Sequence, residues 1–130
     1  MTKEWYEDTI LDKTIPNFKP TNVKFITDFH YYIDYNSYYE KVSLLEMGFL
    51  VEADNKKFIL KIKFYDVSSL DLIGFGNNYN QLMGFKINNL SNSGYEKRKK
   101  YFVEDYENKI IKFYCAGLEI LSLVELKKSN

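Results

Sequence analysis

Few residues of this chain have the chemistry that catalysis requires, and their spacing does not assemble a catalytic set. His30 is the only histidine among the 130 residues, and Cys115 is the only cysteine. A hydrolytic triad places a serine or cysteine beside a histidine base, but no serine here stands in a G-x-S-x-G pattern. A zinc site usually takes four ligands, of which one histidine and one cysteine supply at most two. We therefore interpret His30 as a partly exposed strand residue beside Asp28.

Glycines and carboxylates provide two further candidate sites. Gly74 and Gly76 could begin a phosphate-binding loop, but Tyr79 replaces the third glycine of a dinucleotide fingerprint and no helical pattern follows. These glycines therefore predict a hairpin turn. Paired carboxylates can perform acid–base chemistry or hold a hard cation. The two groups are Asp66 with Asp71, and Glu104 with Asp105 and Glu107. The second group stands at a predicted hairpin end, where acidic residues commonly serve solvation, so we expect no enzyme, metal or cofactor.

One basic run, residues 97–100, lies beside the aromatic residues Tyr95, Tyr101 and Phe102. Basic residues next to stacking aromatics are typical of surfaces that bind single-stranded nucleic acid. The whole chain, however, has 18 Lys and Arg against 18 Asp and Glu. It therefore lacks the basic excess of most nucleic-acid or anionic-membrane binders. We interpret the run as a solvated loop and expect no direct nucleic-acid binding.

The charges are unevenly divided along the chain, and tyrosine accumulates in the acidic half. Residues 1–54 have 5 Lys and Arg and 10 Asp and Glu, a net charge of −5, whereas residues 55–130 have 13 and 8, a net charge of +5. Five tyrosines fall within residues 31–39, and a strand with alternating faces cannot bury all of them. Exposed tyrosines among carboxylates are typical of protein interfaces, and the alternative is an aromatic strand pair with hydroxyls at the solvent edge. We predict partner contacts by Asp28, Tyr32, Asp34, Tyr35, Tyr38 and Glu40.

From residue 22 onward, hydrophobic residues alternate with polar ones, as in β-strands with one buried face. Asp54 and Asn55 predict a tight hairpin turn, residues 34–37 predict another turn, and Gly48 predicts a bulge or kink in a long strand. By contrast, residues 1–21 predict irregular structure or a short helix near residues 4–13, because two prolines interrupt them. About eight strands are expected, over residues 22–32, 39–51, 58–65, 70–75, 82–88, 101–105, 110–115 and 118–126.

These elements predict a mainly β protein, a single antiparallel domain over residues 1–130 in which residues 22–126 form the β structure. A sandwich, a barrel and a strongly curved sheet all satisfy the pattern, and the alternative is an α+β domain with one helix on a curved sheet. No signal peptide or membrane-spanning run is visible, and one cysteine cannot form an internal disulfide, so we expect a cytoplasmic protein. The predicted core contains Phe25, Leu45, Met47, Leu60, Ile62, Leu72, Phe85, Val103, Phe113 and Ile120.

Four short segments of the C-terminal half combine strand hydrophobics with turn residues. They are FYDVSSL at residues 64–70, QLMGFKI at 81–87, DYE at 105–107 and FYC at 113–115. Together they resemble segments of small uncharacterised Firmicute proteins, which are often encoded beside polymorphic or contact-dependent toxins and look like immunity proteins. The resemblance covers residues 42–125 and implies a toxin-neutralising binding protein. It implies no catalytic residues.

These observations predict a non-catalytic immunity protein that binds and neutralises a cognate toxin domain. Nucleases are one expected class of toxin, because their basic, phosphate-binding clefts would attract an acidic, tyrosine-rich surface. One alternative is a small-molecule-binding β-barrel, which would enclose a large aromatic pocket, whereas a flat or convex acidic face would favour a protein partner. The least favoured alternative is an enzyme that uses carboxylates. The sequence does not indicate the oligomeric state.

Overall fold

A computed structural model describes residues 4–74, 81–90 and 99–127, and most regular structure in these ranges is β-strand. The long sheet has the strand order β1 (Val23–Tyr35), β2 (Lys41–Ala53), β3 (Lys56–Tyr65) and β8 (Gly117–Leu126). The short sheet has the order β4 (Ser68–Leu72), β7 (Ile111–Cys115), β6 (Tyr101–Asp105) and β5 (Phe85–Asn89). All strand pairs are antiparallel. The predicted mainly β fold is confirmed, and its two open sheets do not close into a barrel.

The N-terminal segment contains the short helix that the sequence predicted, although the helix covers fewer residues. Helix α1 (Ile10–Thr14) begins after Thr9, whose side-chain oxygen accepts a hydrogen bond from the Leu11 N–H at 3.2 Å. It ends just before Ile15, because a residue that precedes a proline disfavours the helical conformation. A 3-10 helix, η1 (Pro20–Asn22), follows. No helix in the described ranges has the length and hydrophobicity needed to cross a membrane.

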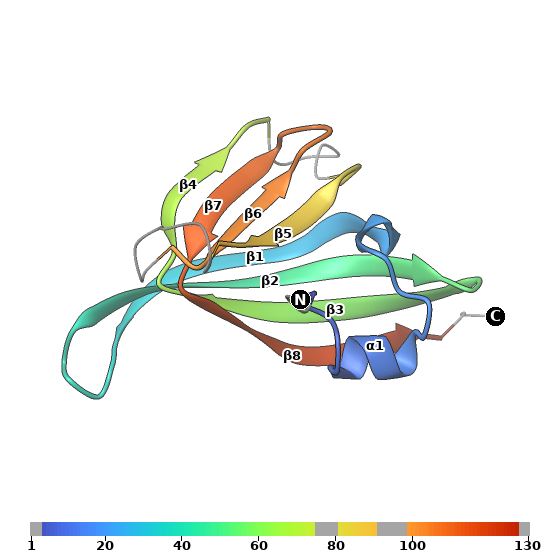
Figure 1. Ribbon diagram of the computed structural model, residues 1–130, viewed down its shortest axis with the longest axis horizontal. Helices are drawn as coiled ribbons and strands as arrows, with labels where there is room; N and C mark the ends of the chain where they lie inside the picture. The colour runs from blue at the N-terminus through green and yellow to red at the C-terminus, as the bar shows by residue number, and fades with distance from the viewer. Residues whose placement is uncertain (1–3, 75–80, 91–98, 128–130) are drawn as a thin grey trace.

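Figure 1 shows the short sheet covering only part of the long sheet, with the N-terminal segment lying over another part. Helix α1 contacts β8, while η1 contacts β2 and β5. The chain passes between the sheets twice, and both passages are fixed to the long sheet. The Val67 N–H donates to the Ser43 carbonyl at 3.2 Å, and the Ala116 N–H donates to the Tyr65 carbonyl at 2.8 Å.

The β2–β3 hairpin turns where the sequence predicted, but the predicted irregularity at Gly48 lies in the neighbouring strand. Asp54 and Asn55 have φ values of 53° and 63°, as a two-residue type I′ turn requires. Strand β2 pairs with β3 without interruption through Gly48, whereas the β1 register shifts between Ile26 and Asp28. A Cβ at Gly48 would lie 2.8 Å from Thr27 Oγ1. Glycine is therefore present because the bulge of β1 approaches it closely.

The buried core lies between the two sheets and includes most of the predicted residues. Phe49 packs on Phe85 and Phe64 on Phe113, each with ring centroids 5.0 Å apart. Three predicted core residues differ. Phe25 is only half-buried, because the shifted register of β1 buries Val23 and Ile26 instead. Leu72 ends an edge strand and is 38% exposed, and Ile120, also on an edge strand, is partly buried against the core.

Candidate partner-binding surface

The β1–β2 hairpin continues beyond the strands that flank it. Leu44 is the last β2 residue to pair with β3, and the pairs from Ile33 with Ser43 to Tyr35 with Lys41 have no further strand beside them. We call residues 33–43 the hairpin arm. Figure 1 shows this hairpin extending past β3 and β8 and past the short sheet. Its base is anchored, because the Ser43 hydroxyl donates to the Val67 carbonyl at 2.6 Å and the Ser43 carbonyl accepts from the Val67 N–H.

The tip of the arm is organised by the side chain and backbone of Asn36. Its Oδ1 accepts from the Tyr38 N–H at 2.8 Å and from the Glu40 N–H at 3.0 Å. Its backbone carbonyl accepts from the Tyr39 N–H, and its Nδ2 donates to Glu40 Oε1. The turn therefore spans residues 36–40, two residues later than predicted, and Tyr39 adopts a φ of 61°. Asparagine is well suited to such a turn, because its short side chain bonds to nearby backbone groups.

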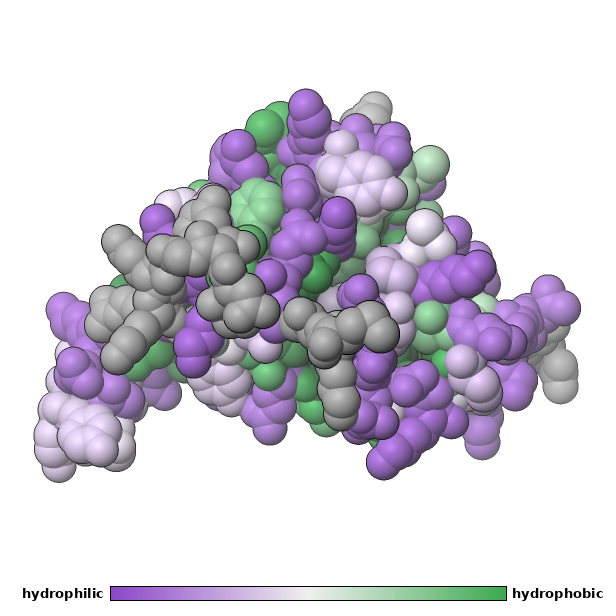
Figure 2. Space-filling view, in the orientation of Figure 1, coloured by the Kyte–Doolittle hydropathy of each residue, from purple (hydrophilic) through white to green (hydrophobic). Residues whose placement is uncertain are grey.

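This ordered tip exposes large aromatic side chains. Tyr38 is 80% exposed and Tyr39 is 88% exposed, and Ile33 and Tyr35 on the arm are also exposed. In Figure 2 the arm protrudes at the lower left and ends in pale side chains of intermediate hydropathy. Exposed aromatic residues that protrude from a fixed scaffold are typical anchors of protein interfaces. Tyr39 and Ile33 were not among the predicted contact residues, although Tyr39 belongs to the tyrosine cluster that the sequence revealed.

The six predicted contact residues divide between two faces and the tip. Residues paired directly across antiparallel strands share a face, and Tyr31 pairs with the buried Leu45. Strand alternation therefore puts Tyr35 on the core-facing side of the sheet, beyond the reach of the core. Asp28, Tyr32 and Asp34 lie on the opposite, outer face. The structure thus brings four of the six onto the arm, namely Asp34, Tyr35, Tyr38 and Glu40.

Asp28 lies apart from the arm and has a cationic neighbour. At about 3.3 Å per residue, it stands roughly 20 Å along β1 from Asp34. Its carboxylate is 3.9 Å from the ammonium of Lys61 on β3, across the side-chain-free position Gly48. Because both side chains are exposed, this ion pair contributes little to stability. Asp28 therefore belongs to the outer face of the long sheet and not to the arm.

The outer face carries a polar network in which two tyrosines bind two glutamates. The Tyr32 hydroxyl donates to Glu46 at 2.5 Å, and the Tyr65 hydroxyl donates to Glu119 at 2.7 Å. The bond to Glu46 raises the pKa of Tyr32 to about 12, and the bond to Glu119 likewise raises the pKa of Tyr65. His30 stacks on Tyr32 with ring centroids 4.6 Å apart. These bonds fix the orientation of Tyr32, which is the only predicted contact residue held in this way within the described ranges.

The arm also carries carboxylates without cationic partners. Across residues 28–46 there are four carboxylates and one lysine. Lys61 pairs with Asp28, and Lys63 stands directly opposite Glu46 in the strand register. Asp34 and Glu40 form no ion pair with any described residue; they accept hydrogen bonds from Tyr35 and Asn36 instead. Residues 33–43 contain these two carboxylates and Lys41, so the arm has a net charge of −1.

The other carboxylates and the cysteine that could have served in catalysis or metal binding lie in contacts that support the fold. Asp105 is 1% exposed, and its Oδ1 accepts from the Gly84 N–H at 2.8 Å and the Met83 N–H at 3.3 Å. Burial raises the pKa of the Cys115 thiol to about 12, which disfavours the reactive thiolate. Asp71 pairs with Lys112 at 3.8 Å. Within the described ranges, no three His, Cys, Asp or Glu side chains are grouped as metal ligands. Gly76, Tyr79, Tyr95 and residues 97–98 lie outside those ranges.

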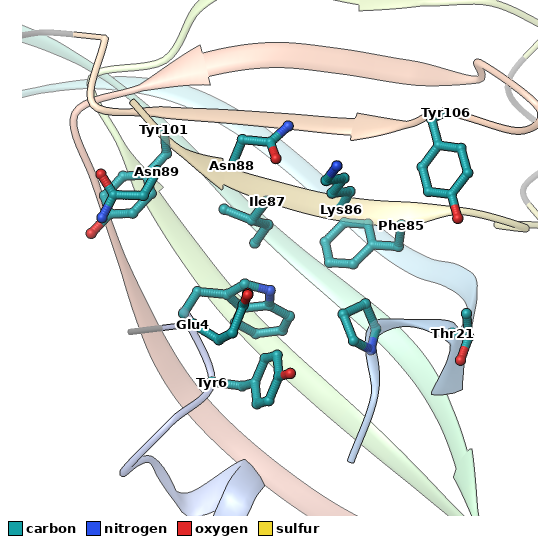
Figure 3. Close-up of a pocket in the computed structure, with 12 residues that line it drawn as sticks. Glu4, Tyr6, Thr21, Phe85, Lys86, Ile87, Asn88, Asn89, Tyr101 and Tyr106 are labelled. Carbon is teal, nitrogen blue, oxygen red and sulfur yellow. The ribbon is translucent and has the colours of Figure 1, made fainter. Parts of the chain in front are cut away.

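A groove of about 720 Å³ lies along the contact between the N-terminal segment and strand β5. Figure 3 shows Glu4 and Tyr6 on one side and Phe85 to Asn89 on the other. The groove is open and lined by both polar and apolar residues, unlike the enclosed aromatic pocket that a small-molecule barrel would need. Sequence reasoning missed this groove, because its two sides are about 80 positions apart in the chain.

Comparisons of the chain with known protein families, with curated proteins and with solved structures give no match.

Proposed function

We propose that this protein binds and neutralises another protein through its hairpin arm, as an immunity protein does with its cognate toxin domain. The observation that carries the proposal is the tip itself, where Asn36 holds the backbone that presents Tyr38 and Tyr39 to solvent. A tip ordered before binding loses less conformational entropy on association than a flexible loop would. Tyrosine adds large contact area with few rotatable bonds, which is why it dominates many binding surfaces.

Charge supports a basic partner site. Asp34 and Glu40 flank the tip and form no ion pair with any described residue, although Lys41 follows Glu40 in the chain, so a partner cation could pair with each of them. Toxin domains that cleave nucleic acids have basic clefts, because they must hold phosphates. A narrow projecting hairpin with carboxylates near its end has a shape and charge suited to such a cleft. Complementary charge would mainly increase the association rate and select the correct partner.

A protein partner fits the molecule better than a small apolar ligand does. The arm is convex and solvent-exposed, whereas the groove beside β5 is open and half polar. Buried aromatic anchors surrounded by a polar rim account for most of the affinity in protein interfaces. The arm offers both features, since Tyr38 and Tyr39 project between Asp34 and Glu40 along a short stretch of chain.

Co-expression with a candidate toxin domain tests this proposal, and the candidate is taken from the product of the neighbouring reading frame. We expect the wild-type protein to restore growth of cells that produce the toxin domain. The double variant Tyr38→Ser, Tyr39→Ser should fail to restore growth while remaining folded, because these exposed side chains contribute nothing to the core. Val124→Ala, a change at a residue 57% exposed on β8, is the matched control and should protect fully.

Two results would count against the proposal in different ways. Cell death despite soluble, folded wild-type protein would reject the immunity function. Full protection by the double tyrosine variant would reject the arm as the binding surface while leaving the function in place.

A further inference from the structure

Strand β5 is the last strand of the short sheet, and one of its edges has no partner strand within residues 4–74, 81–90 and 99–127. The Gly84 carbonyl accepts from the Tyr106 N–H, and the Leu90 N–H donates to the Lys100 carbonyl. Hydrogen-bonded pairs alternate along an antiparallel ladder, and the β5–β6 register is continuous. Lys86 and Asn88 therefore direct their backbone groups toward β6. Phe85 and Ile87 direct theirs away from it, toward the groove, where no described residue pairs with them.

The groove beside this edge has the size and lining of a peptide site. Its volume of about 720 Å³ lies in the range of known ligand sites. Trp5 and Tyr6 form the opposite side of the groove, and the Trp5 ring packs against the Phe85 ring with centroids 6.1 Å apart. The buried Trp5 Nε1 has no acceptor among the described residues. A buried donor without an acceptor is costly, and the far edge of an added strand carries carbonyls that could serve as that acceptor.

We propose that the β5 edge binds an extended peptide segment of a partner protein as an additional antiparallel strand. The backbone N–H and C=O groups of Phe85 and Ile87 would pair with two alternate residues of the peptide, as in other cases of strand addition. Those two peptide side chains face the core side of the sheet, next to Trp5 and Tyr6, and are therefore apolar. This site is independent of the hairpin arm.

The residue between the two apolar ones is acidic. It lies opposite Lys86 and shares its face, because directly paired residues in an antiparallel sheet point to the same side. Lys86 is exposed and forms no ion pair among the described residues, although Glu104 stands opposite it on β6. The recognised segment thus has the pattern apolar–acidic–apolar in an extended conformation.

The corresponding edge of the long sheet is less accessible. Near its start, β1 is bridged by Gln81, and the Leu82 N–H donates to the Lys24 carbonyl at 2.7 Å. Near its end, the Tyr35 N–H is occupied by Asp34 Oδ1 at 2.8 Å. Blocked backbone groups of this kind protect an edge strand from pairing. The β5 edge is therefore more open to an added strand than the β1 edge.

Amide hydrogen exchange, followed by NMR on the full chain, tests the free edge. The amides of Phe85 and Ile87 should exchange at least about ten-fold faster than those of Lys86 and Asn88, which bond to β6. Adding the blocked peptide acetyl-Ser-Val-Glu-Val-Ser-amide should slow exchange at Phe85 and Ile87 selectively. Protection of both amides before any peptide is added would overturn the proposal, because the edge would already be occupied.

Fluorescence of Trp5, the only tryptophan of the chain, measures the binding itself. The same peptide should change this fluorescence saturably at concentrations up to about 1 mM. A version of the peptide with N-methylated valines cannot donate hydrogen bonds to the edge, so it should not change the fluorescence saturably. Lys86→Glu should weaken binding of the Glu peptide by up to about five-fold and favour the Val-Lys-Val version instead. The absence of a saturable change, or equal binding of the N-methylated peptide, would overturn the proposal.

Discussion

The Tyr32 hydroxyl donates to Glu46 at 2.5 Å, and this bond stabilises the protonated phenol. Its pKa is raised from 10.0 to about 12, chiefly by that hydrogen bond, so the folded state holds the proton more tightly than the unfolded chain does. The stabilisation is complete below pH 10 and is lost as the pH rises toward 12. Stability changes with pH in the same direction for Cys115, because burial raises the pKa of its thiol from 9.0 to about 12.

We therefore expect the free energy of unfolding to fall between pH 9 and 12 in the wild type, and to fall less above pH 10 in Tyr32→Phe. NMR titration of the Tyr32 ring carbon Cζ measures its pKa directly. In Glu46→Gln the pKa should return toward 10, because the carboxylate that accepts the bond is gone. A Tyr32 pKa that is the same in the wild type and in Glu46→Gln would contradict the assigned cause.

At the scale of elements, the positions of the strands could be predicted from the sequence, whereas bulges and turn positions depend on contacts with neighbouring residues. Period-two alternation located the strands because each strand buries a single face. Asp54 and Asn55 correctly identified the turn between β2 and β3. Alternation alone could not show that β1 bulges beside Gly48, since a bulge is a relation between two strands. The turn at the arm began at Asn36 and not at Asp34, because the Asn36 side chain bonds to the backbone that follows it.

Close approach of β1 leaves little room for a side chain at Gly48. A Cβ there would lie 2.8 Å from Thr27 Oγ1 and 3.0 Å from Asp28 Cβ, so Gly48→Ala should lower the free energy of unfolding by about 1–3 kcal/mol. Gly117→Ala is the matched control, because a Cβ at Gly117 would have no neighbour within 4 Å. Urea denaturation measures both variants. Equal stability of the two would show that the bulge does not restrict Gly48.

At the scale of the whole molecule, the two oppositely charged halves of the sequence do not form two halves in space. Lys61 and Lys63 come from the basic half, yet β3 places them beside Asp28 and Glu46 of the acidic half. The acidic surface that the sequence predicted is therefore reduced to the arm, where Asp34 and Glu40 form no ion pair with a described residue. Four of the six predicted contact residues lie there. The groove beside β5 could not be predicted, because it depends on how the N-terminal segment packs.

The affinity of the cognate toxin domain for Tyr38→Ala, measured by titration calorimetry beside the wild type, tests the central claim most directly. Tyr38 is 80% exposed, so its removal should leave the fold intact and act on binding alone. Loss of a central tyrosine anchor should cost about 2 kcal/mol or more, which corresponds to an affinity about 30-fold weaker. Val124→Ala should bind as the wild type does. Equal affinity of Tyr38→Ala and the wild type would contradict the claim that the hairpin arm binds the partner.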